Sequence, residues 1–332
     1  MASPIVVGID GGNSKTDVAV ADFSGRVLGR ARGGGTPSPI GGSDLPSGGA
    51  DALAGRLAGL VADAVAETGC HQKPAAAVMY LANVDMPDEQ QALDQALAPF
   101  NVADQVVVGN DTIAVLRAGT DEGWGVAVVL GSGINAIGIG PDGQTERFLG
   151  IGPVSGDWGG GRTIAITGVG AVVRAEDGRG DATALTHSLP SYFGFATGHE
   201  LALAIRRGTV ASSRVLELTP LVFAAAGAGD RMAMQIIERQ CDEVVAMVQA
   251  LIRRLGLLRL PTPVILGGGV ARGAESLLVG AIKGRLANVA PLAKVQVLRL
   301  PPVVGAVAAA LDLAGAGLEA VHNARMHDWD AA

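Results

Sequence analysis

The chain has 332 residues, of which 48% are hydrophobic and 17% charged, and this composition indicates a folded protein with room for two domains. Its net charge of −7 leaves no basic stripe for phosphates, which excludes nucleic acid as a main partner. Cys70 and Cys241 lack a Cys or His at metal-ligand spacing, so we expect both to be reduced. No leader-like or membrane-length apolar segment is visible, which predicts a cytoplasmic protein that does not enter a membrane.

The first third of the chain alternates predicted strands and helices. Strands are predicted at residues 4–9, 17–22, 26–31, 76–81 and 106–108, and helices at 51–67, 88–98 and 112–118. The segment 33–49 is rich in glycine, proline and serine, which predicts a loop between the third strand and the first helix. Its length favours a functional loop.

The rest of the chain repeats this theme and then changes. The predicted elements are a hairpin at 125–140, a glycine-rich segment at 150–161, helices over 163–257 with the longest at 230–254, and a strand, helix, strand and helix at 264–266, 273–287, 295–298 and 301–314. This order predicts an α/β protein in two similar halves, with a ligand in the cleft between them. We expect one half to contain residues 1–118 and the helical segment 302–332, and the other to contain residues 119–301 with a helical insertion.

Two glycine-rich turns, Gly11–Thr16 and Gly131–Gly133, each lie between two strand-like runs. Glycine brings bare backbone N–H groups close to a ligand, so two such hairpins could clamp a polyphosphate from both sides. Each hairpin ends in a second turn, at residues 22–25 and 140–143. The matched order of strand, turn, strand and turn indicates a diverged internal duplication, although glycine-punctuated hairpins also look alike without common origin.

Three acidic residues are candidates for chemistry, and each has a structural alternative. Asp10 could hold Mg²⁺ through water, or satisfy amides of its own turn. Asp111 could accept a proton from an alcohol, but Asn-Asp-Thr before a helix is also good N-cap chemistry. Asp157 could bind sugar hydroxyls, or cap the helix that begins near Arg162. The Gly267–Gly269 turn would let a base or ribose lie against the backbone.

In this order, these motifs resemble the sugar kinase/actin/hexokinase superfamily and, more narrowly, the N-acetylglucosamine kinase and BadF/BadG/BcrA/BcrD ATPase family. The resemblance spans about residues 4–312 and rests on Asp10-Gly11-Gly12 with Ser14–Thr16, Asn110-Asp111, Gly131–Asn135, Gly156-Asp157 and Gly267–Gly269. It implies two ribonuclease-H-like (actin-like) domains with ATP and Mg²⁺ in the cleft between them. It also implies a homodimer.

The resemblance assigns roles to individual residues. Phosphate would be bound by Gly11, Gly12, Asn13, Ser14, Lys15, Thr16, Gly131, Ser132 and Gly133, with Gly267, Gly268 and Gly269 facing adenosine. Asp10 would position Mg²⁺, and Asp111 would be the general base for the sugar hydroxyl. The sugar contacts would come from Thr36, Asn83, Asn110, Asn135 and Asp157. The implied reaction is phosphoryl transfer from ATP to an amino sugar such as N-acetylglucosamine or glucosamine.

Two departures from the family pattern lie in the implied sugar pocket. Asp157-Trp158 stands where the sugar kinases usually carry Asp-Glu, and Thr36-Pro37-Ser38 stands where they often present Thr-Asn. Both leave the implied ATP site intact. The acceptor is therefore less well defined than the nucleotide, and glucosamine, another amino sugar or a non-sugar alcohol stays open.

The main alternative is an ATPase activator subunit that couples hydrolysis to a partner enzyme. Such activators hold an iron–sulfur cluster between subunits through glycine-flanked cysteines, a context that Cys70 and Cys241 lack. A sugar-sensing regulator would need a helix-turn-helix, for which the residues before the first strand leave no room. An actin-like filament protein and an inactive kinase-like protein also stay open.

Overall fold

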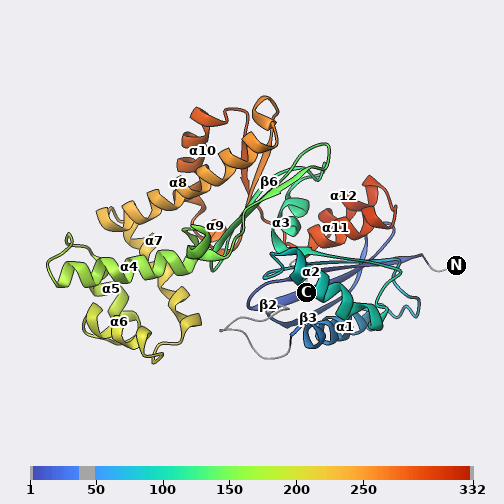
Figure 1. The fold of residues 1–332 in the computed structure, drawn as a ribbon, viewed down its shortest axis with the longest axis horizontal. Helices are drawn as coiled ribbons and strands as arrows, with labels where there is room; N and C mark the ends of the chain where they lie inside the picture. Colours follow the sequence, from blue (N-terminus) through green and yellow to red (C-terminus); the bar gives the residue numbers. More distant parts are fainter. Residues whose placement is uncertain (1–2, 37–48, 330–332) are drawn as a thin grey trace. The chain divides into compact units, whose positions relative to one another are not determined.

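A computed structural model describes residues 3–36 and 49–329 (Figure 1). The chain divides into two compact units, Met1–Ala127 with Ile139–Gly143 and Leu298–Ala332, and Val128–Gly138 with Gln144–Val297. Two five-stranded sheets with flanking helices confirm the predicted α/β class. The domain ranges expected from the sequence stay a prediction.

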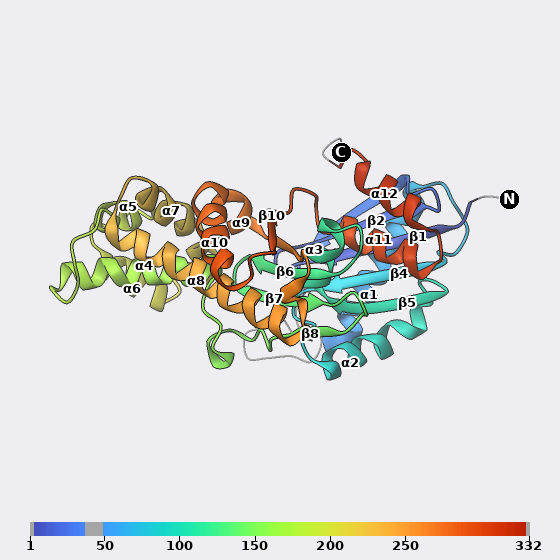
Figure 2. The same ribbon diagram turned by 90° about the horizontal axis from the view of Figure 1, so that it is seen from above.

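The first sheet has the strand order β3-β2-β1-β4-β5 (Figure 2). Its strands are β1 (Ile5–Gly11), β2 (Lys15–Asp22), β3 (Val27–Gly34), β4 (Ala76–Leu81) and β5 (Gln105–Asn110). β2 pairs antiparallel with β1 and β3, whereas β1, β4 and β5 are parallel. The three parallel strands end together, because the register places Gly11 beside Leu81 and Leu81 beside Asn110.

The second sheet has the order β10-β9-β6-β7-β8. Its strands are β6 (Gly125–Leu130), β7 (Ile134–Ile139), β8 (Thr145–Arg147), β9 (Pro263–Gly267) and β10 (Lys294–Val297). In both sheets three consecutive strands lie side by side and the two later strands continue from the first of them. This shared topology supports the internal duplication inferred from the hairpins.

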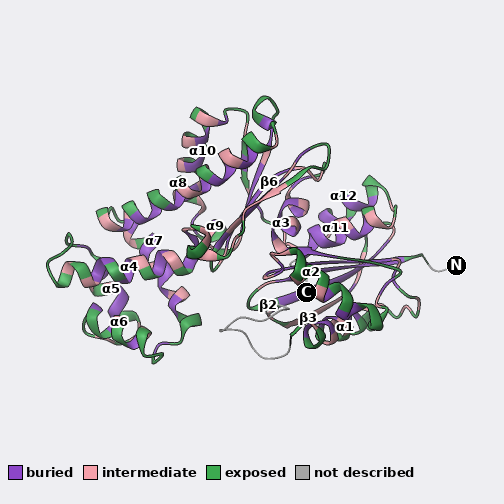
Figure 3. Cartoon of the chain, viewed as in Figure 1, coloured by how far each residue is buried: buried purple, intermediate pink, exposed green. Residues whose placement is uncertain are grey.

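Helices cover both faces of the first sheet (Figure 1). One face carries α1 (Gly49–Glu67) and α2 (Pro87–Leu97), and the other carries α3 (Asp111–Gly119), α11 (Val303–Leu313) and α12 (Leu318–Met326). Successive strand side chains alternate, so Val7 of β1 is buried under α1 while Val6 is buried under α11. The inner strands β1, β2 and β4 are largely buried, as the colour of β2 in Figure 3 illustrates. A Cβ at Gly8 would lie 2.3 Å from the Val307 nitrogen, so the glycine lets α11 lie directly on the sheet.

The second unit is richer in helices, as the sequence predicts. They are α4 (Gly160–Glu176), α5 (Leu185–Tyr192), α6 (Gly198–Arg206), α7 (Thr219–Gly227), α8 (Arg231–Arg254), α9 (Gly269–Gly273) and α10 (Glu275–Val289). Short 3-10 helices are η1 (Ala98–Phe100) in the first unit and η2 (Gly152–Ser155), η3 (Ser212–Leu218) and η4 (Leu257–Arg259) in the second. The helix predicted at 273–287 is wrong at its start: α9 and α10 are separate, because Ala274 between them has φ −123° and ψ 22°.

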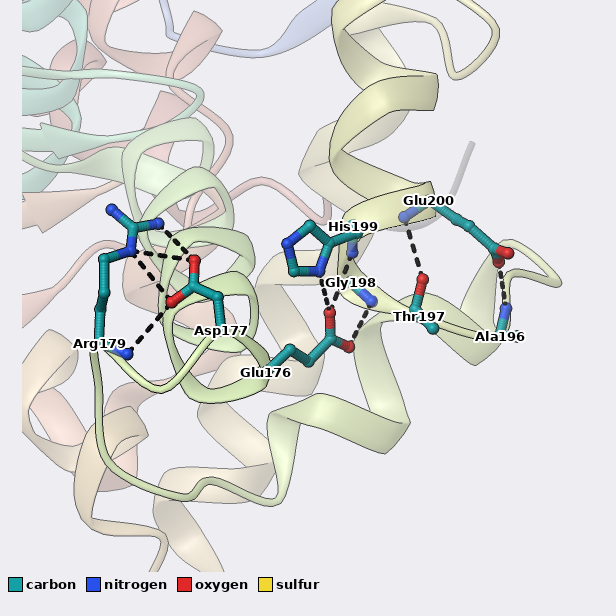
Figure 4. A network of polar contacts seen from close by, with 8 residues as sticks. All are labelled: Glu176, Asp177, Arg179, Ala196, Thr197, Gly198, His199 and Glu200. Carbon is teal, nitrogen blue, oxygen red and sulfur yellow. Dashed lines mark hydrogen bonds and ion pairs between the residues drawn. The ribbon is translucent and has the colours of Figure 1, made fainter.

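Glu176, at the end of α4, fixes the start of α6 (Figure 4). Its carboxylate accepts hydrogen bonds from the backbone nitrogens of Gly198 at 2.6 Å and His199 at 3.1 Å, and the His199 ring Nδ1 lies 2.8 Å from Oε2. Partial burial raises the pKa of Glu176, but these hydrogen bonds outweigh it and hold the pKa below its ordinary value.

In the part of the chain that the structure describes, no helix has the length and apolarity needed to cross a membrane.

Candidate active site

The turn between β1 and β2 lies where the parallel strands of the first sheet end. It consists of residues 12–14 alone, because Gly11 belongs to β1 while Lys15 and Thr16 belong to β2. The Gly12 nitrogen donates to the Lys15 carbonyl oxygen at 2.8 Å and closes the turn. Thr16 is buried, and its hydroxyl donates to the Gly34 carbonyl oxygen at 2.7 Å, so this hydroxyl links β2 to β3. The predicted phosphate loop 11–16 is therefore a much shorter turn.

Thr36 and Asn83 brace this turn from two other segments. The Thr36 nitrogen donates to the Gly12 carbonyl oxygen at 2.9 Å, and its hydroxyl donates to the Gly11 carbonyl oxygen at 3.0 Å. Asn83 Nδ2 donates to Asn13 Oδ1 at 2.8 Å and to the Thr36 carbonyl oxygen at 2.9 Å. Asn83 has a φ of 63°, which non-glycine residues seldom adopt and which is common at functional sites. Asn13, Thr36 and Asn83, all predicted from the sequence, thus lie together.

Residues 37 and 38, which carry one departure from the family pattern, lie outside the described residues. The effect of that departure on the sugar pocket therefore stays a prediction from the sequence. The sugar contact predicted for Thr36 also stays a prediction.

Asn110 is the N-cap of α3. Its Oδ1 accepts from the Thr112 nitrogen at 3.1 Å, and its Nδ2 donates to Asp85 Oδ1 at 2.9 Å. Asn110 is 3% exposed, so its side chain is committed to these bonds. Asp111 is the half-buried first residue of the helix. The capping role considered for this segment thus belongs to Asn110. Asp111 directly follows β5, and its role as general base stays a prediction.

Asp10, on β1, lies directly opposite Asp17 of β2. Two carboxylates at this spacing repel, and Asp17 is neutralised by its ion pairs: Lys15 Nζ lies 2.5 Å from Oδ2 and Arg32 Nε lies 2.6 Å from Oδ1. Ser14 is exposed in the turn. Asp17 is a site residue that was not predicted from the sequence, although Lys15 and Asp17 lie two residues apart on one strand face.

The second hairpin turn, Gly131–Gly133, is held by the first turn of α4. The Gly161 nitrogen donates to the Gly131 carbonyl oxygen at 2.8 Å, and the Arg162 nitrogen donates to the Ser132 carbonyl oxygen at 2.9 Å. The C=O and N–H of a trans peptide point in opposite directions, so the amides of Ser132 and Gly133 point away from α4. Both residues are exposed, and two adjacent aligned amides are suited to an anion.

A pocket of about 600 Å³ lies beside this turn. It is lined by Gly131, Ser132, Gly161, Leu216, Thr219, Pro220, Phe223, Ala224, Gly269, Val270, Gly273, Ala274, Ser276 and Leu277. Its volume is within the range of small-molecule sites, and its walls are mainly apolar. Gly131, Ser132 and Gly269 are predicted from the sequence, whereas the walls from η3, α7 and α10 are not. One available signal was the apolar character of α7 on all sides, which indicates either burial or a ligand.

Gly268 joins the pocket to the second sheet. It has a φ of 93°, and a Cβ there would lie 2.3 Å from the Leu130 carbonyl oxygen at the end of β6. Only glycine allows this close approach. Of the three glycines predicted to face adenosine, Gly267 ends β9, Gly268 packs on β6, and Gly269 lines the pocket.

Asn135 and Asp157, the other predicted sugar contacts, have local partners in the second unit. Asn135 Oδ1 accepts from the Ala136 nitrogen at 2.8 Å. Asp157 Oδ2 accepts from the Gly152 nitrogen at 3.1 Å and from the Ser155 hydroxyl, so it closes the 152–157 turn. The alternative that Asp157 caps α4 is wrong, because the N-cap is a glycine at residue 159.

Trp158, the other departure from the family pattern, stacks with Arg239 of α8. The guanidinium carbon lies 4.2 Å from the ring centroid, which is within range of a cation–π contact. Burial raises the pKa of Glu243, which lies one turn further along α8, and the positive charge of nearby Arg239 offsets only part of that rise. The 157–160 segment therefore lies against α8.

Neither cysteine belongs to a cluster of potential metal ligands. No group of three or more His, Cys, Asp or Glu side chains lies at metal-binding distance within residues 3–36 and 49–329. Both cysteines are free, and burial raises the pKa of the Cys241 thiol to about 11. This thiol is therefore a poor nucleophile at neutral pH.

Comparison with known proteins shows which protein family this chain resembles in sequence. Residues 7–312 match the BadF/BadG/BcrA/BcrD ATPase family. The chain is 25% identical over 273 residues to an N-acetylmuramic acid/N-acetylglucosamine kinase of Clostridium acetobutylicum, covering 82% of this chain and 87% of the relative. It is 26% identical over 323 residues to an N-acetyl-D-glucosamine kinase of Dictyostelium discoideum, covering 94% of this chain and 99% of the relative.

A solved structure is similar over nearly the whole chain. It is a Chromobacterium violaceum protein described provisionally as an N-acetylglucosamine kinase, with a TM-score of 0.71, 21% identity, and coverage of 92% of this chain and 98% of that one. At this identity the likeness shows the fold, and with the two five-stranded sheets it confirms the actin-like α/β class. Because the family match spans most of its length, the chain belongs to the BadF/BadG/BcrA/BcrD ATPase family.

Proposed function

We propose that this chain is an ATP-dependent sugar kinase that phosphorylates a hydroxyl of an amino sugar such as N-acetylglucosamine or glucosamine. The observation that carries the proposal is the pairing of an outward-facing amide turn, Gly131–Gly133, with an apolar pocket of about 600 Å³ beside it. The turn suits phosphate and the pocket suits a nucleoside. Both named relatives are kinases of N-acetylglucosamine, which favours a sugar as the acceptor.

The second unit would bind the nucleotide. Its base and ribose would lie between α7 and the α9–α10 segment, with Gly269 allowing contact with the backbone. The amides of Ser132 and Gly133 would donate to phosphate oxygens. The first hairpin turn, Gly12–Ser14, would supply further backbone donors to the phosphates. Bound ATP would supply the phosphoryl group, while the protein's share is positioning and charge neutralisation.

Asp10 would hold Mg²⁺ through the ion's water ligands. Mg²⁺ keeps several waters and usually binds through one or two carboxylates with phosphate oxygens, so a single carboxylate at the end of a strand suffices. Asp17, directly opposite, is already neutralised by Lys15 and Arg32. Asp17 is therefore not proposed as a magnesium ligand.

Asp111 would accept the proton of the sugar hydroxyl. β1 and β5 are separated by β4, which places their ends two strand spacings, about 10 Å, apart. This leaves room for a hydroxyl and a phosphoryl group between Asp10 and Asp111. Asn110 fixes the start of α3 and thereby the backbone of Asp111.

The sugar itself would contact Thr36, Asn83, Asn135 and Asp157. In the first unit, Asn83 already presents a side-chain amide beside the hairpin turn. In the second unit, Asp157 offers a carboxylate on a short ordered turn. Asn110 would act indirectly, because its amide is used by the cap.

An ADP-release assay with ATP, Mg²⁺ and a panel of sugars tests the proposal. Strong stimulation by one amino sugar is the expected result, and slow release indifferent to every sugar would favour the activator-type ATPase instead.

Asp111→Asn should lower turnover by about 10²- to 10⁴-fold while leaving ATP binding nearly intact. Asp104→Asn is the matched control, since Asp104 is an exposed partner of Lys73 in the same unit. Wild-type turnover in Asp111→Asn would remove Asp111 from the base role.

A further inference from the structure

Gln240 is a buried polar residue in the middle of α8. Its relative exposure is 0%, and the residues beside it on the buried face of α8 are mainly apolar. Its Oε1 accepts a hydrogen bond from the Gly160 nitrogen at 2.8 Å. Its Nε2 has no hydrogen-bond partner among the residues that the structure describes. Buried polar groups are costly, so an amide at this position calls for a specific reason.

The first turn of α4 lies between Gln240 and the hairpin turn. Three successive amides of this turn are used: Gly160 donates to Gln240, Gly161 to Gly131, and Arg162 to Ser132. The first amides of a helix have no partner inside the helix, so here they link two other segments. The first turn of α4 thus connects the middle of α8 to the carbonyl side of the hairpin turn.

Two glycines make this connection close. Gly160 has a φ of 76°, and a Cβ there would lie 2.2 Å from the Gly133 carbonyl oxygen. Gly159 has a φ of 141°, and a Cβ there would lie 2.8 Å from both polar atoms of the Gln240 amide. A side chain at either position would separate α4 from the hairpin or from α8.

We propose that Gln240 is a positioning residue for nucleotide binding, acting through the first turn of α4 on the amides of Ser132 and Gly133. This inference rests on the proposed function, because it takes those amides as phosphate ligands. Gln240 fixes Gly160, the next two amides of α4 hold the carbonyls of the hairpin turn, and the opposite side of the same peptides faces the phosphates. Loss of the Gln240 acceptor frees the start of α4, and the two amides lose their common direction.

Gln240→Met tests this directly, because methionine has a similar length and shape but offers no comparable acceptor. The Kd for Mg-ATP, measured by titration calorimetry, should rise about tenfold or more, since small misplacements of binding groups cost that much. Amide hydrogen exchange across residues 159–162 should rise as well. Cys241→Ala is the matched control, because Cys241 is the next residue of α8 and is 1% exposed. It should change neither quantity.

Gly159→Ala perturbs the same contact from its other side. Its methyl group displaces the Gln240 amide, so it should weaken ATP binding in the same way. The double variant should be no weaker than the worse single variant, because both remove one interaction. Full additivity of the two effects on Kd would show that they act separately and would overturn the proposal.

The outcomes separate this inference from the proposed function. If the wild-type protein does not bind Mg-ATP, the proposed function fails. If the wild-type protein binds Mg-ATP and Gln240→Met binds it equally well with unchanged exchange at 159–162, the positioning role is refuted. A general rise in exchange along the whole of α8 with a lowered Tm would show a merely structural role, and it would also refute the inference.

Discussion

Gly268→Ala tests how the pocket is joined to the second sheet. The residue has a φ of 93°, and the new Cβ would lie 2.3 Å from the Leu130 carbonyl oxygen and 3.0 Å from the Gly131 nitrogen. The left-handed backbone costs an L-residue about 1–2 kcal/mol, and forcing atoms into a packed site costs about 1–3 kcal/mol. The variant should therefore lose about 2–5 kcal/mol of unfolding free energy. Its clash also pushes the β9–α9 turn away from the hairpin turn.

Urea unfolding and titration with Mg-ATP measure the two consequences. We expect a lower unfolding midpoint and a Kd for ATP raised at least tenfold, because the two walls of the pocket separate. Gly273→Ala is the control: Gly273 lines the same pocket, but a Cβ there meets no atom within 4 Å. That variant should unfold like the wild-type protein. Wild-type stability and affinity in Gly268→Ala would refute the argument that this glycine sets the pocket geometry.

Two further predictions concern stability. Arg325 of α12 donates to the carbonyl oxygens of Arg117 and Thr120 at the end of α3, and burial lowers its pKa to about 10. The free-energy cost of burying the guanidinium therefore offsets part of the stabilisation from its hydrogen bonds. Arg325→Met should lower the free energy of unfolding, measured in urea, by only about 1–3 kcal/mol. A loss above about 5 kcal/mol would contradict this balance. The pKa of Glu176 is lower in the folded chain than its ordinary value of 4.5, so its stabilisation is complete above pH 4.5 and is lost as the pH falls through the folded pKa. The stability difference between wild type and Glu176→Gln should therefore shrink in acid, and a difference constant from pH 7 to pH 3 would count against it.

The sequence predicted best where local chemistry decides the structure. α8 was predicted at 230–254 and runs from Arg231 to Arg254, because Asp230 caps it and its apolar residues recur at helical spacing. β3 was predicted to end at residue 31 and extends to Gly34. Glycine has no strand preference of its own, and the extension depends on pairing with Lys15 and Thr16 of β2. Such pairing is a tertiary contact that no local pattern reveals.

The candidate site divides in the same way. The turns themselves are visible as glycine after an apolar run, so the sequence predicts Gly131, Ser132 and Gly269 of this pocket. The walls from η3 and α7 come from segments that are far from those turns in the sequence, whereas α10 follows Gly269 closely, directly after the short helix α9. The apolar character of α7 on all sides is compatible with burial as well as with a ligand, and only packing decides that Phe223 faces a pocket.

The two hairpins show what a duplication conserves and what it leaves to diverge. Both sheets keep the same strand order, since that order is fixed by the main-chain hydrogen bonds of each sheet. The turns are braced differently: the Thr36 amide and hydroxyl and the Asn83 side chain hold the first, whereas only backbone amides of α4 are described as holding the second. Side-chain braces can be replaced one residue at a time, but backbone amides act only if the whole helix is correctly placed. The second turn therefore depends, through the first turn of α4, on one buried glutamine of a neighbouring helix.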